Sequence, residues 1–364
     1  MFKRNHKRIL VVRPDRVGDV VLSTPVYRSL RTLIPGAFIG AMVSSYTSPL
    51  LYRNPNIDVI IHDDARLGRP QDFWRQVGVI RSYEFDTALL LMPTKRLAYM
   101  LFLAGIPYRL GVGHILYEVI TFTHGVSRNN YNPLRHESEY MLDLVRRIAG
   151  TNNTDGKIQA IKLEIFLDES ERNEAVKYLE EKRLDCRRPI VGIHPGSGRS
   201  APNWNTEKYL ELMNKLADND VQVLVTGSPE EKSLEKNFSR QSGKRIATSF
   251  GELSIRKLAA VISRLSVFVS SSTGPMHIAA ALGVATVSMF CPLTACSPEL
   301  WGPKGNRSSV ILPPDGFCQL RCPGDPHICT FGEKEEGITV ERVYEATRDI
   351  LDKTEAVSIN KGAE

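Results

Sequence analysis

A glycine–aspartate pair directly follows the first apolar run of the chain. Gly18 and Asp19 come just after residues 8–13, which read RILVVR and have the composition of a buried strand. Glycine permits a tight turn, which would place Asp19 at the carboxyl end of that strand, where open parallel sheets bind ligands. A carboxylate that stays charged beside Arg13 or Arg16 can act as a general base toward a hydroxyl group. Spacing alone also fits a residue that only stabilises a helix start, so both roles stay open.

A glycine-rich loop follows the apolar run 189–193 and reads HPGSGRSA over residues 194–201. Its Gly-x-Gly-x-x-Ala spacing is similar to a dinucleotide fingerprint, whose glycines let backbone N–H groups approach a diphosphate. Pro202 interrupts the loop before a helix begins, and no acidic residue ends a strand about 20 residues later, which argues against NAD. We expect a phosphate-binding loop that uses Ser197 and Arg199, and a plain surface loop is the alternative.

A third segment, residues 270–283, reads SSSTGPMHIAAALG. Hydroxyl residues, a proline at the first helical positions, an alanine-rich run and a closing glycine predict a well-capped helix. The start of such a helix offers free N–H groups and the positive end of the helix dipole, which suit a diphosphate leaving group. His277 in the first turn could add a hydrogen bond. A purely structural helix is the alternative.

Apolar runs alternate with amphipathic stretches, which is the pattern of parallel α/β structure. Strands are predicted at 8–13, 38–43, 58–62, 87–92, 108–112, 189–193, 221–226, 245–248, 267–270 and 284–290. Helices are predicted at 25–33, 72–82, 96–104, 136–148, 207–217, 230–240, 254–263, 275–282 and 340–351, and the charged stretch 168–188 is read as a helix and turn. The two series are separated near residues 150–188, which indicates two α/β halves.

Composition limits the classes of protein that fit. With 364 residues, 42% of them hydrophobic, the chain can form two buried cores, so disorder of the whole chain is excluded. The net charge of +6 comes without a run of five or more Lys or Arg, so we expect no nucleic-acid partner. No segment approaches the roughly 20 apolar residues that cross a bilayer, and the short apolar run 9–12 does not suit a secretory signal. We therefore expect a cytoplasmic protein.

We expect neither a metal nor a cofactor. Cys318, Cys322 and Cys329, with His327 between the last two, could supply zinc ligands, but buried or merely tolerated thiols are the interpretation we favour. The D-x-D sequence at 218–220 precedes a predicted strand, so it lies at the amino end of the sheet and is read as a turn.

In their order along nearly the whole chain, these segments resemble glycosyltransferase family 9, the lipopolysaccharide heptosyltransferases. The resemblance rests on GDV at 18–20, TP at 24–25, HPGS at 194–197, Trp204, TG at 226–227, Glu230, Glu231 and STGPMH at 272–277. It implies the GT-B fold, in which two Rossmann-like domains face each other across a cleft. The expected parts are an acceptor-binding domain 1–165, a linker 166–188, a nucleotide-sugar-binding domain 189–340, and a C-terminal helix and tail 341–364 that packs back on the first domain.

The resemblance also implies a reaction. A heptose or related sugar would pass from a nucleotide-sugar such as ADP-heptose to a lipopolysaccharide core or related surface glycan, at the cytoplasmic face of the inner membrane. Asp19 is the implied base of an inverting, metal-independent transfer. The implied donor-binding residues are Ser197, Arg199, Thr226, Gly227, Glu230, Glu231, Ser272, Thr273, Gly274, Pro275 and His277. The implied acceptor-binding residues are Arg13, Arg16, Lys95, Arg96 and Arg109.

Two positions on the donor side depart from the family pattern. Ser272 stands where the family usually has aspartate, and Pro202 stands where it commonly has lysine, two residues before Trp204. The alternative is therefore a degenerate member of the same fold that binds nucleotide or glycan without catalysis. The retained Gly18-Asp19 pair and the segment 273–277 favour the enzyme.

Overall fold

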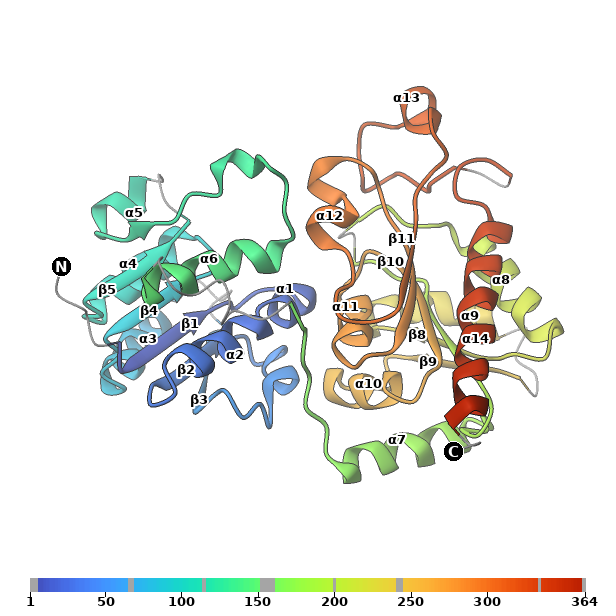
Figure 1. Ribbon diagram of the computed structural model, residues 1–364, viewed down its shortest axis with the longest axis horizontal. Coiled ribbons are helices and arrows are strands. Elements are labelled where there is room, and N and C mark those ends of the chain that lie inside the picture. Colours follow the sequence, from blue (N-terminus) through green and yellow to red (C-terminus); the bar gives the residue numbers. More distant parts are fainter. Residues whose placement is uncertain are drawn as a thin grey trace. The chain divides into compact units, whose positions relative to one another are not determined.

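A computed structural model describes residues 6–64, 69–112, 116–150, 161–198, 201–239, 245–332 and 335–361, with side chains as far as Lys353. The chain divides into two compact units, Met1–Phe166 and Leu167–Glu364 (Figure 1). Each unit contains a six-stranded, wholly parallel sheet with helices packed against it. Within the described ranges, no helix is both long enough and apolar enough to cross a lipid bilayer.

The sheet of the first unit has the order β3-β2-β1-β4-β5-β6. Its strands are β1 (Arg8–Val12), β2 (Phe38–Val43), β3 (Val59–His62), β4 (Thr87–Leu90), β5 (Tyr108–Gly111) and β6 (His124–Gly125). Its helices are α1 (Val17–Leu22), α2 (Thr24–Leu33), α3 (Pro70–Ser82), α4 (Lys95–Leu103), α5 (Leu116–Ile120) and α6 (Glu137–Ala149), with short 3₁₀ turns at Ser48–Leu51 and Asn129–Tyr131.

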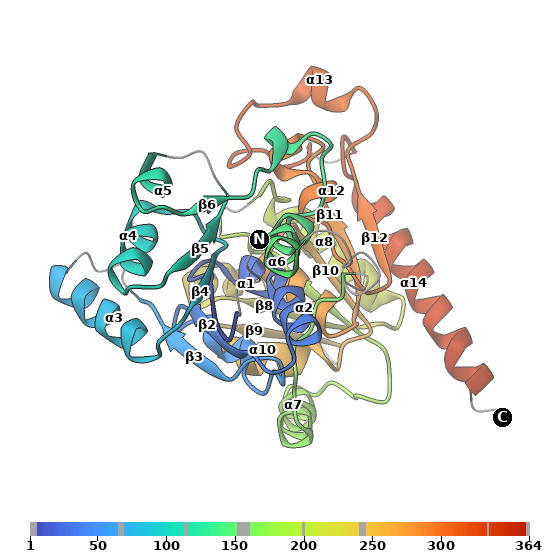
Figure 2. The same cartoon turned by 60° about the vertical axis from the view of Figure 1, so that its left-hand side comes forward.

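Burial on both faces of this sheet explains why its central strands are mostly apolar. In β1, Leu10 and Val12 pack in one cluster with the apolar sides of α3 and α4. Ile9 and Val11 point to the opposite face, because strand side chains alternate, and they are also fully buried. Helices α3, α4 and α5 lie next to one another in that order (Figure 2), and α4 packs on β4.

The sheet of the second unit has the order β12-β11-β10-β7-β8-β9. Its strands are β7 (Ile190–His194), β8 (Gln222–Gly227), β9 (Ile246–Phe250), β10 (Val267–Ser271), β11 (Ala285–Met289) and β12 (Ser308–Ile311). Its helices are α7 (Glu169–Glu181), α8 (Thr206–Asp218), α9 (Glu235–Ser239), α10 (Ile255–Ile262), α11 (Gly274–Ala281), α12 (Pro298–Trp301), α13 (Phe317–Arg321) and α14 (Val340–Lys361), with 3₁₀ turns at Pro229–Leu234 and Thr294–Cys296.

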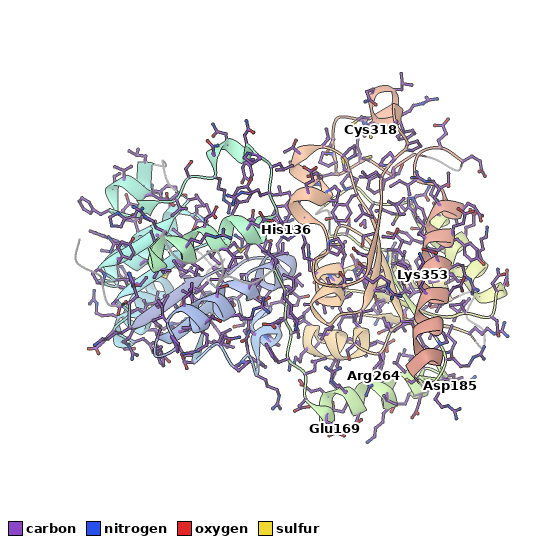
Figure 3. The ribbon with its side chains drawn as sticks, viewed as in Figure 1. His136, Glu169, Asp185, Arg264, Cys318 and Lys353 are labelled. Carbon is purple, nitrogen blue, oxygen red and sulfur yellow. The ribbon has the colours of Figure 1, made fainter. Side chains whose placement is uncertain are left out.

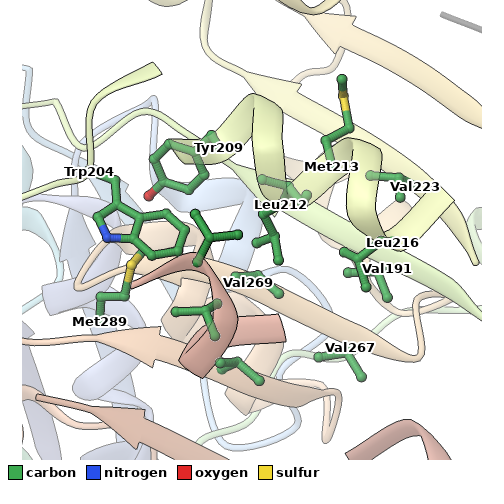
Figure 4. Close-up of a cluster of buried hydrophobic side chains, with 14 of the residues drawn as sticks. Val191, Trp204, Tyr209, Leu212, Met213, Leu216, Val223, Val267, Val269 and Met289 are labelled. Carbon is green, nitrogen blue, oxygen red and sulfur yellow. The ribbon is translucent and has the colours of Figure 1, made fainter. Parts of the chain in front are cut away.

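The core of the second unit lies where α8 meets the sheet (Figure 4). Leu212, Met213 and Leu216 lie on one side of α8 and pack with the strand residues Val191 and Val223, all of them buried. Burying one such side chain fully contributes about 1.5–3 kcal/mol. The spacing of three and four residues on α8 and the alternation of side chains along the strands thus direct these residues into the same buried cluster.

Two expectations about the chain's organisation need correction. In the segment 166–188 the predicted helix is present as α7, but it starts with a capping box between Asp168 and Glu171 and packs against α10 within the second unit, so it is not a linker. The last helix, expected to pack on the first domain, instead buries Val343, Ile350 and Leu351 in the core of the second unit. The apolar face of α14 is thus part of the core shown in Figure 4.

The predicted strands are all present, and their ends agree within two residues. The single helix predicted over 230–240 is instead a 3₁₀ turn, Pro229–Leu234, followed by the short helix α9. A capping box between Ser228 and Glu231 fixes the start of this turn.

Candidate active site

The strand order of each sheet reverses at one place, and ligands of open α/β sheets bind at the carboxyl ends of the strands next to such a switch point. In the first unit the switch point lies between β1 and β4, and Asp19 follows β1. In the second unit it lies between β7 and β10, which are followed by Ser197 and Thr273. The three segments with candidate chemistry therefore all lie at switch points.

Arg13 fixes Asp19 beside the switch point of the first unit. Its guanidinium donates a hydrogen bond to Oδ1 of Asp19 and another, of 2.6 Å, to the carbonyl oxygen of Leu91 after β4. Its backbone N–H donates to the carbonyl of Met42 in β2 at 2.9 Å. Arg13 is only 5% exposed, so it is a buried cation that ties three neighbouring strands to the carboxylate. It acts here as a positioning residue for Asp19, in place of the acceptor contact that was expected of it.

A second buried carboxylate lies near the same arginine. Glu137, the first residue of α6, has Oε1 3.8 Å from Nη1 of Arg13. Arg128 donates to both oxygens of Glu137, at 2.7 and 2.9 Å. His136 caps α6 by accepting from the N–H of Ser138 at 3.4 Å (Figure 3). The resulting Arg128–Glu137–Arg13–Asp19 set was missed from the sequence, since an acid at a helix start looks like an ordinary dipole-stabilising residue.

The electrostatics of Asp19 suit a general base. Burial raises the pKa of its carboxyl above the usual value; the charge and hydrogen bond of Arg13 oppose the increase, and the charges of Asp15 and Glu137 add to it. A carboxylate whose pKa is raised toward the working pH is a stronger base, and the nearby cation keeps its charged form accessible. The side chain of Asp19 remains 16% exposed, so it is only partly buried.

Three of the expected acceptor-binding cations lie on the surface of the first unit. Arg16, at the N-cap of α1, and Lys95, at the start of α4, are exposed. Arg96 is half-buried, and it pairs with the buried carboxylate of Asp63. Arg16 and Lys95 thus present their charge to solvent, while part of the Arg96 guanidinium is used within the unit.

Arg109 has a structural role that corrects the expectation for it. The residue lies inside β5 and is 6% exposed. Its guanidinium donates to the carbonyl oxygen of Ile106, and to that of Thr121 at 2.6 and 3.2 Å. Through these hydrogen bonds Arg109 holds the connection after α4 and the end of α5, and its buried guanidinium is not presented to an acceptor.

In the second unit, His194 ends β7 and connects the loops after β7 and β8. Its Nδ1 forms a hydrogen bond of 3.0 Å with Oγ1 of Thr226, and its Nε2 lies 3.6 Å from Oε2 of Glu231. Burial lowers the pKa of His194, and the charge of Glu231 opposes that change. Thr226 was expected to bind donor, but it is 1% exposed and its hydroxyl is used by His194. Its role is to position the loop.

The two acids of the turn after β8 differ in placement. Glu231 accepts from the N–H of Ser228 at 2.8 Å, and its carboxylate covers Gly196 so closely that a Cβ there would lie 1.8 Å from Oε1. Glu230 is exposed, and hydrogen bonds from its own N–H and the Ser228 hydroxyl lower its pKa. Glu230 is therefore the more exposed of the two acids. Gly227 lies under a ring of the neighbouring strand, since a Cβ there would be 2.1 Å from Cδ1 of Phe250.

The N-terminus of α11 has the features of an anion site. Thr273 is its N-cap with extended backbone, its side chain makes no capping bond, and Pro275 lies in the first turn. Thr273 is 4% exposed, and within the described part of the chain its Oγ1 is buried without a hydrogen-bond partner. A buried hydroxyl without a partner costs about 1–3 kcal/mol unless a ligand satisfies it. Gly274 and Ser272 flank the cap half-buried, and His277 is buried in the first turn.

Two of the expected donor-binding residues follow β7 in the sequence. Ser197 is half-buried after β7, while Arg199 lies outside the described residues. Four cysteines, Cys291, Cys318, Cys322 and Cys329, line a cavity of about 630 Å³. Burial raises the pKa of Cys291 to about 11. Over the described ranges, no three His, Cys, Asp or Glu side chains are grouped so that they could hold a metal ion.

Two Rossmann-like units, each with candidate ligand loops at the switch point of its sheet, have the architecture of the GT-B fold. Residues 73–319, more than half of the chain, match the family model of glycosyltransferase family 9 (heptosyltransferase). The chain therefore belongs to glycosyltransferase family 9 and is a glycosyltransferase, as its motifs predicted.

Similar proteins span almost the whole chain. Lipopolysaccharide heptosyltransferase 2 of Escherichia coli is 27% identical over 370 aligned positions, which cover 96% of this chain and 100% of that protein. The glycosyltransferase family 9 protein of Veillonella parvula has a similar structure, with a TM-score of 0.80, 21% identity and coverage of 97% and 99%. The ADP-heptose lipopolysaccharide heptosyltransferase II of E. coli gives a TM-score of 0.75 at 23% identity, with coverage of 96% and 99%. These structures confirm the predicted fold class.

Proposed function

We propose that this glycosyltransferase moves a heptose from a nucleotide-activated donor such as ADP-heptose to a lipopolysaccharide core, with inversion and without a metal ion. The observation that carries the proposal is the buried Arg13–Asp19 pair at the switch point of the first unit. The names of the relatives support the choice of sugar and acceptor, since the E. coli protein that is 27% identical is a lipopolysaccharide heptosyltransferase.

Asp19 supplies the base. Arg13 occupies Oδ1, which leaves Oδ2 to accept the proton of an acceptor hydroxyl. As that proton moves to the carboxylate, the acceptor oxygen forms a bond to the anomeric carbon and the bond from that carbon to the diphosphate breaks. A single displacement of this kind inverts the anomeric configuration, and the nucleoside diphosphate leaves with the electron pair. General base catalysis of this type contributes about 10²–10⁴-fold.

The N-terminus of α11 receives the charge of the leaving group. Its free N–H groups and helix dipole attract a diphosphate, and the buried hydroxyl of Thr273 gains the acceptor that it lacks in the described residues. Ser197 adds a hydroxyl from the loop after β7, and the exposed Glu230 is suited to accept from ribose hydroxyls. Donors fixed before the reaction can stabilise developing charge without a metal. Arg199, outside the described residues, remains a proposed phosphate contact.

The exposed cations Arg16 and Lys95 are proposed to contact the phosphorylated acceptor, and the half-buried Arg96 is proposed with them. Such an acceptor is built on a lipid, which fits work at the cytoplasmic face of the inner membrane. One observation favours a second function: Ser272 offers a hydroxyl where the family usually has a carboxylate for the donor sugar. A chain that binds nucleotide-sugars without transferring them would retain the α11 site and lack turnover.

A panel of nucleotide-sugars in a thermal-shift assay, followed by turnover with the donor that binds best, tests the proposal. We expect ADP-heptose to raise Tm more than UDP- or GDP-sugars, and product to form with a heptose-terminated core acceptor. Binding without product would favour the non-catalytic function, and the absence of any stabilising donor would contradict both.

A further inference from the structure

The short helix α5 and its surroundings expose large apolar side chains. Leu116, Val119 and Ile120 of α5 are 75%, 65% and 50% exposed, and Phe122 just after it is 71% exposed. Phe102 of α4 is 38% exposed, and its ring centroid lies 6.3 Å from that of Phe122. We call these five residues the α5 patch. Leu116, Val119 and Ile120 are spaced by three and four residues, so they share one side of the helix and the patch is continuous.

The orientation of α5 is reversed relative to an ordinary surface helix. Its only acidic residue, Glu118, points inward and is 1% exposed. The side chain lies so close to β5 that a Cβ on Gly111 would be 2.4 Å from Oε1 of Glu118. Tyr117 packs against the core of the first unit. A helix that buries its carboxylate and exposes its aliphatic side chains is fixed in this orientation by the protein, and large exposed apolar patches mark interaction sites.

The charge around the patch indicates what binds there. Between residues 87 and 136 the sequence contains Glu118 as its only acid and five cations, but Arg109 is buried on backbone carbonyls and adds no charge to the surface. Three of the cations, Arg96, Arg128 and Arg135, pair with acids of neighbouring elements. Lys95 is exposed two helical turns before Phe102 on α4, and the exposed Arg81 donates to the carbonyl of Leu103 at 2.6 Å. The patch thus has cations at its border, and the nearest acid in the sequence is buried.

We propose that the α5 patch docks on the surface of an anionic phospholipid bilayer. The inference rests on the proposed function, since a lipid-linked acceptor brings the enzyme to such a surface. The five-residue α5 is too short to span a bilayer, but apolar side chains flanked by lysine and arginine suit the boundary between headgroups and acyl chains. Phenylalanine and aliphatic groups would enter the apolar layer, and Arg81 would lie among the headgroup phosphates.

Vesicle sedimentation of the full chain tests the proposal directly. We expect binding to phosphatidylglycerol-containing vesicles, weakened by salt, and at least tenfold weaker binding to pure phosphatidylcholine vesicles. The triple variant Leu116→Ser, Val119→Ser, Phe122→Ser should lose at least tenfold in affinity. A matched control, Leu293→Ser, Leu320→Ser, Ile328→Ser, changes three exposed apolar residues of the second unit and should bind as wild type does. Equal binding by both triple variants, or no binding by wild type, would overturn the proposal.

Single charge substitutions keep the test valid if the triple variant folds poorly. Because Val119 is exposed, Val119→Lys and Val119→Glu should both fold, and on anionic vesicles the lysine variant should bind more tightly than the glutamate variant. Equal affinities would count against docking. Light scattering tests whether a second copy of the chain covers the patch instead. If wild type is a dimer, the triple variant is a monomer and both bind vesicles equally well, the patch binds a protein partner and not a membrane.

Activity measurements distinguish a failure of this inference from a failure of the proposed function. The triple variant should turn over a deacylated, water-soluble acceptor as fast as wild type, and should be at least tenfold slower on the same acceptor embedded in vesicles. Equal rates on both acceptors would contradict docking while leaving the transferase intact. If the wild-type protein binds vesicles but no nucleotide-sugar raises its Tm, only the proposed function is contradicted.

Discussion

Arg13 donates a hydrogen bond to Oδ1 of Asp19 from the interior of the first unit, and the same guanidinium holds the carbonyl oxygen of Leu91 at 2.6 Å. One buried cation therefore sets both the position of the carboxylate and its charge state. The carboxylate follows β1, and Leu91 follows β4, so the pair connects the two strands that flank the switch point.

Arg13→Lys should move the acid limb of the pH–rate profile to higher pH. Burial already raises the pKa of Asp19, and Arg13 opposes this, so weakening the cation's contact raises the pKa further. A base must be deprotonated to act, and the fraction of active enzyme at low pH therefore falls. A rise of one pKa unit corresponds to about 1.4 kcal/mol and to roughly tenfold less activity on the acid side.

The pH dependence of kcat/KM measures this shift. Arg31→Lys is the matched control, because Arg31 pairs with Asp58 at 2.7 Å elsewhere in the same unit. Its profile should have the wild-type midpoint. An Arg13→Lys enzyme that is slower at every pH, with an unchanged midpoint, would show that Arg13 does not control the protonation of Asp19.

Thr273→Val should weaken donor binding without lowering the stability of the free protein. The hydroxyl of Thr273 is buried without a partner in the described residues, so its replacement by a methyl group removes nothing that folding uses. A hydrogen bond to a charged diphosphate contributes about 1.5–3 kcal/mol, which predicts a roughly 10–100-fold higher Kd. Calorimetric titration with donor measures the effect.

Thr347→Val is the control for this substitution. Thr347 is also fully buried, but its hydroxyl donates to the carbonyl of Val343 at 2.7 Å within α14. That variant should lower Tm slightly and bind donor normally. If Thr273→Val binds donor as tightly as wild type, the leaving group is not held at the start of α11.

Gly196→Ala should destabilise the second unit and disturb donor binding. The new methyl group would meet the Glu231 carboxylate at 1.8 Å, and overpacking of this kind costs about 1–3 kcal/mol. Gly36→Ala, where no atom lies within 4 Å of the added carbon, should be neutral. Adding Glu231→Ala to Gly196→Ala should recover part of the lost stability in chemical denaturation, because it removes the clashing group. Additive losses would show that the contact is not the cause.

EDTA should leave the initial rate of transfer unchanged, because the α11 N-terminus supplies the positive charge that a metal would otherwise provide. Initial rates before and after chelation, with added Mg²⁺ or Mn²⁺ as the comparison, check this. Loss of activity on chelation that returns with one of these ions would contradict the metal-independent mechanism.

The sequence predicted the strands and the three loops well, for a physical reason. A strand that is buried on both faces is mostly apolar, as β1 and β7 are apart from Arg8 and His194 at their ends. Switch-point loops need glycine and small hydroxyl residues that few other positions require. Asp19 and Thr273 were found in this way. The family and the fold class followed from the order of these loops, and the comparisons confirm both.

Long-range side-chain pairing could not be predicted from the sequence. Glu137 and Arg128 form a bidentate pair across nine residues that follow no helical or strand period. Arg109 looked like an acceptor-binding cation, but only the fold shows that the carbonyls of Ile106 and Thr121 use its guanidinium. The spacing of apolar residues predicted the last helix, α14, but this spacing does not show which of the two units the helix packs against.

The rate of Asp19→Asn at saturating donor and acceptor is the most direct test of the account. Asparagine keeps the shape but cannot accept the proton, so kcat should fall by about 10²–10⁴-fold. Donor Kd should stay within twofold of wild type. Tm at neutral pH should not fall, because burial raises the folded pKa of Asp19 and its ionised form therefore contributes less stability as pH rises. An Asp19→Asn enzyme that transfers sugar as fast as wild type would contradict the assignment of Asp19 as the base.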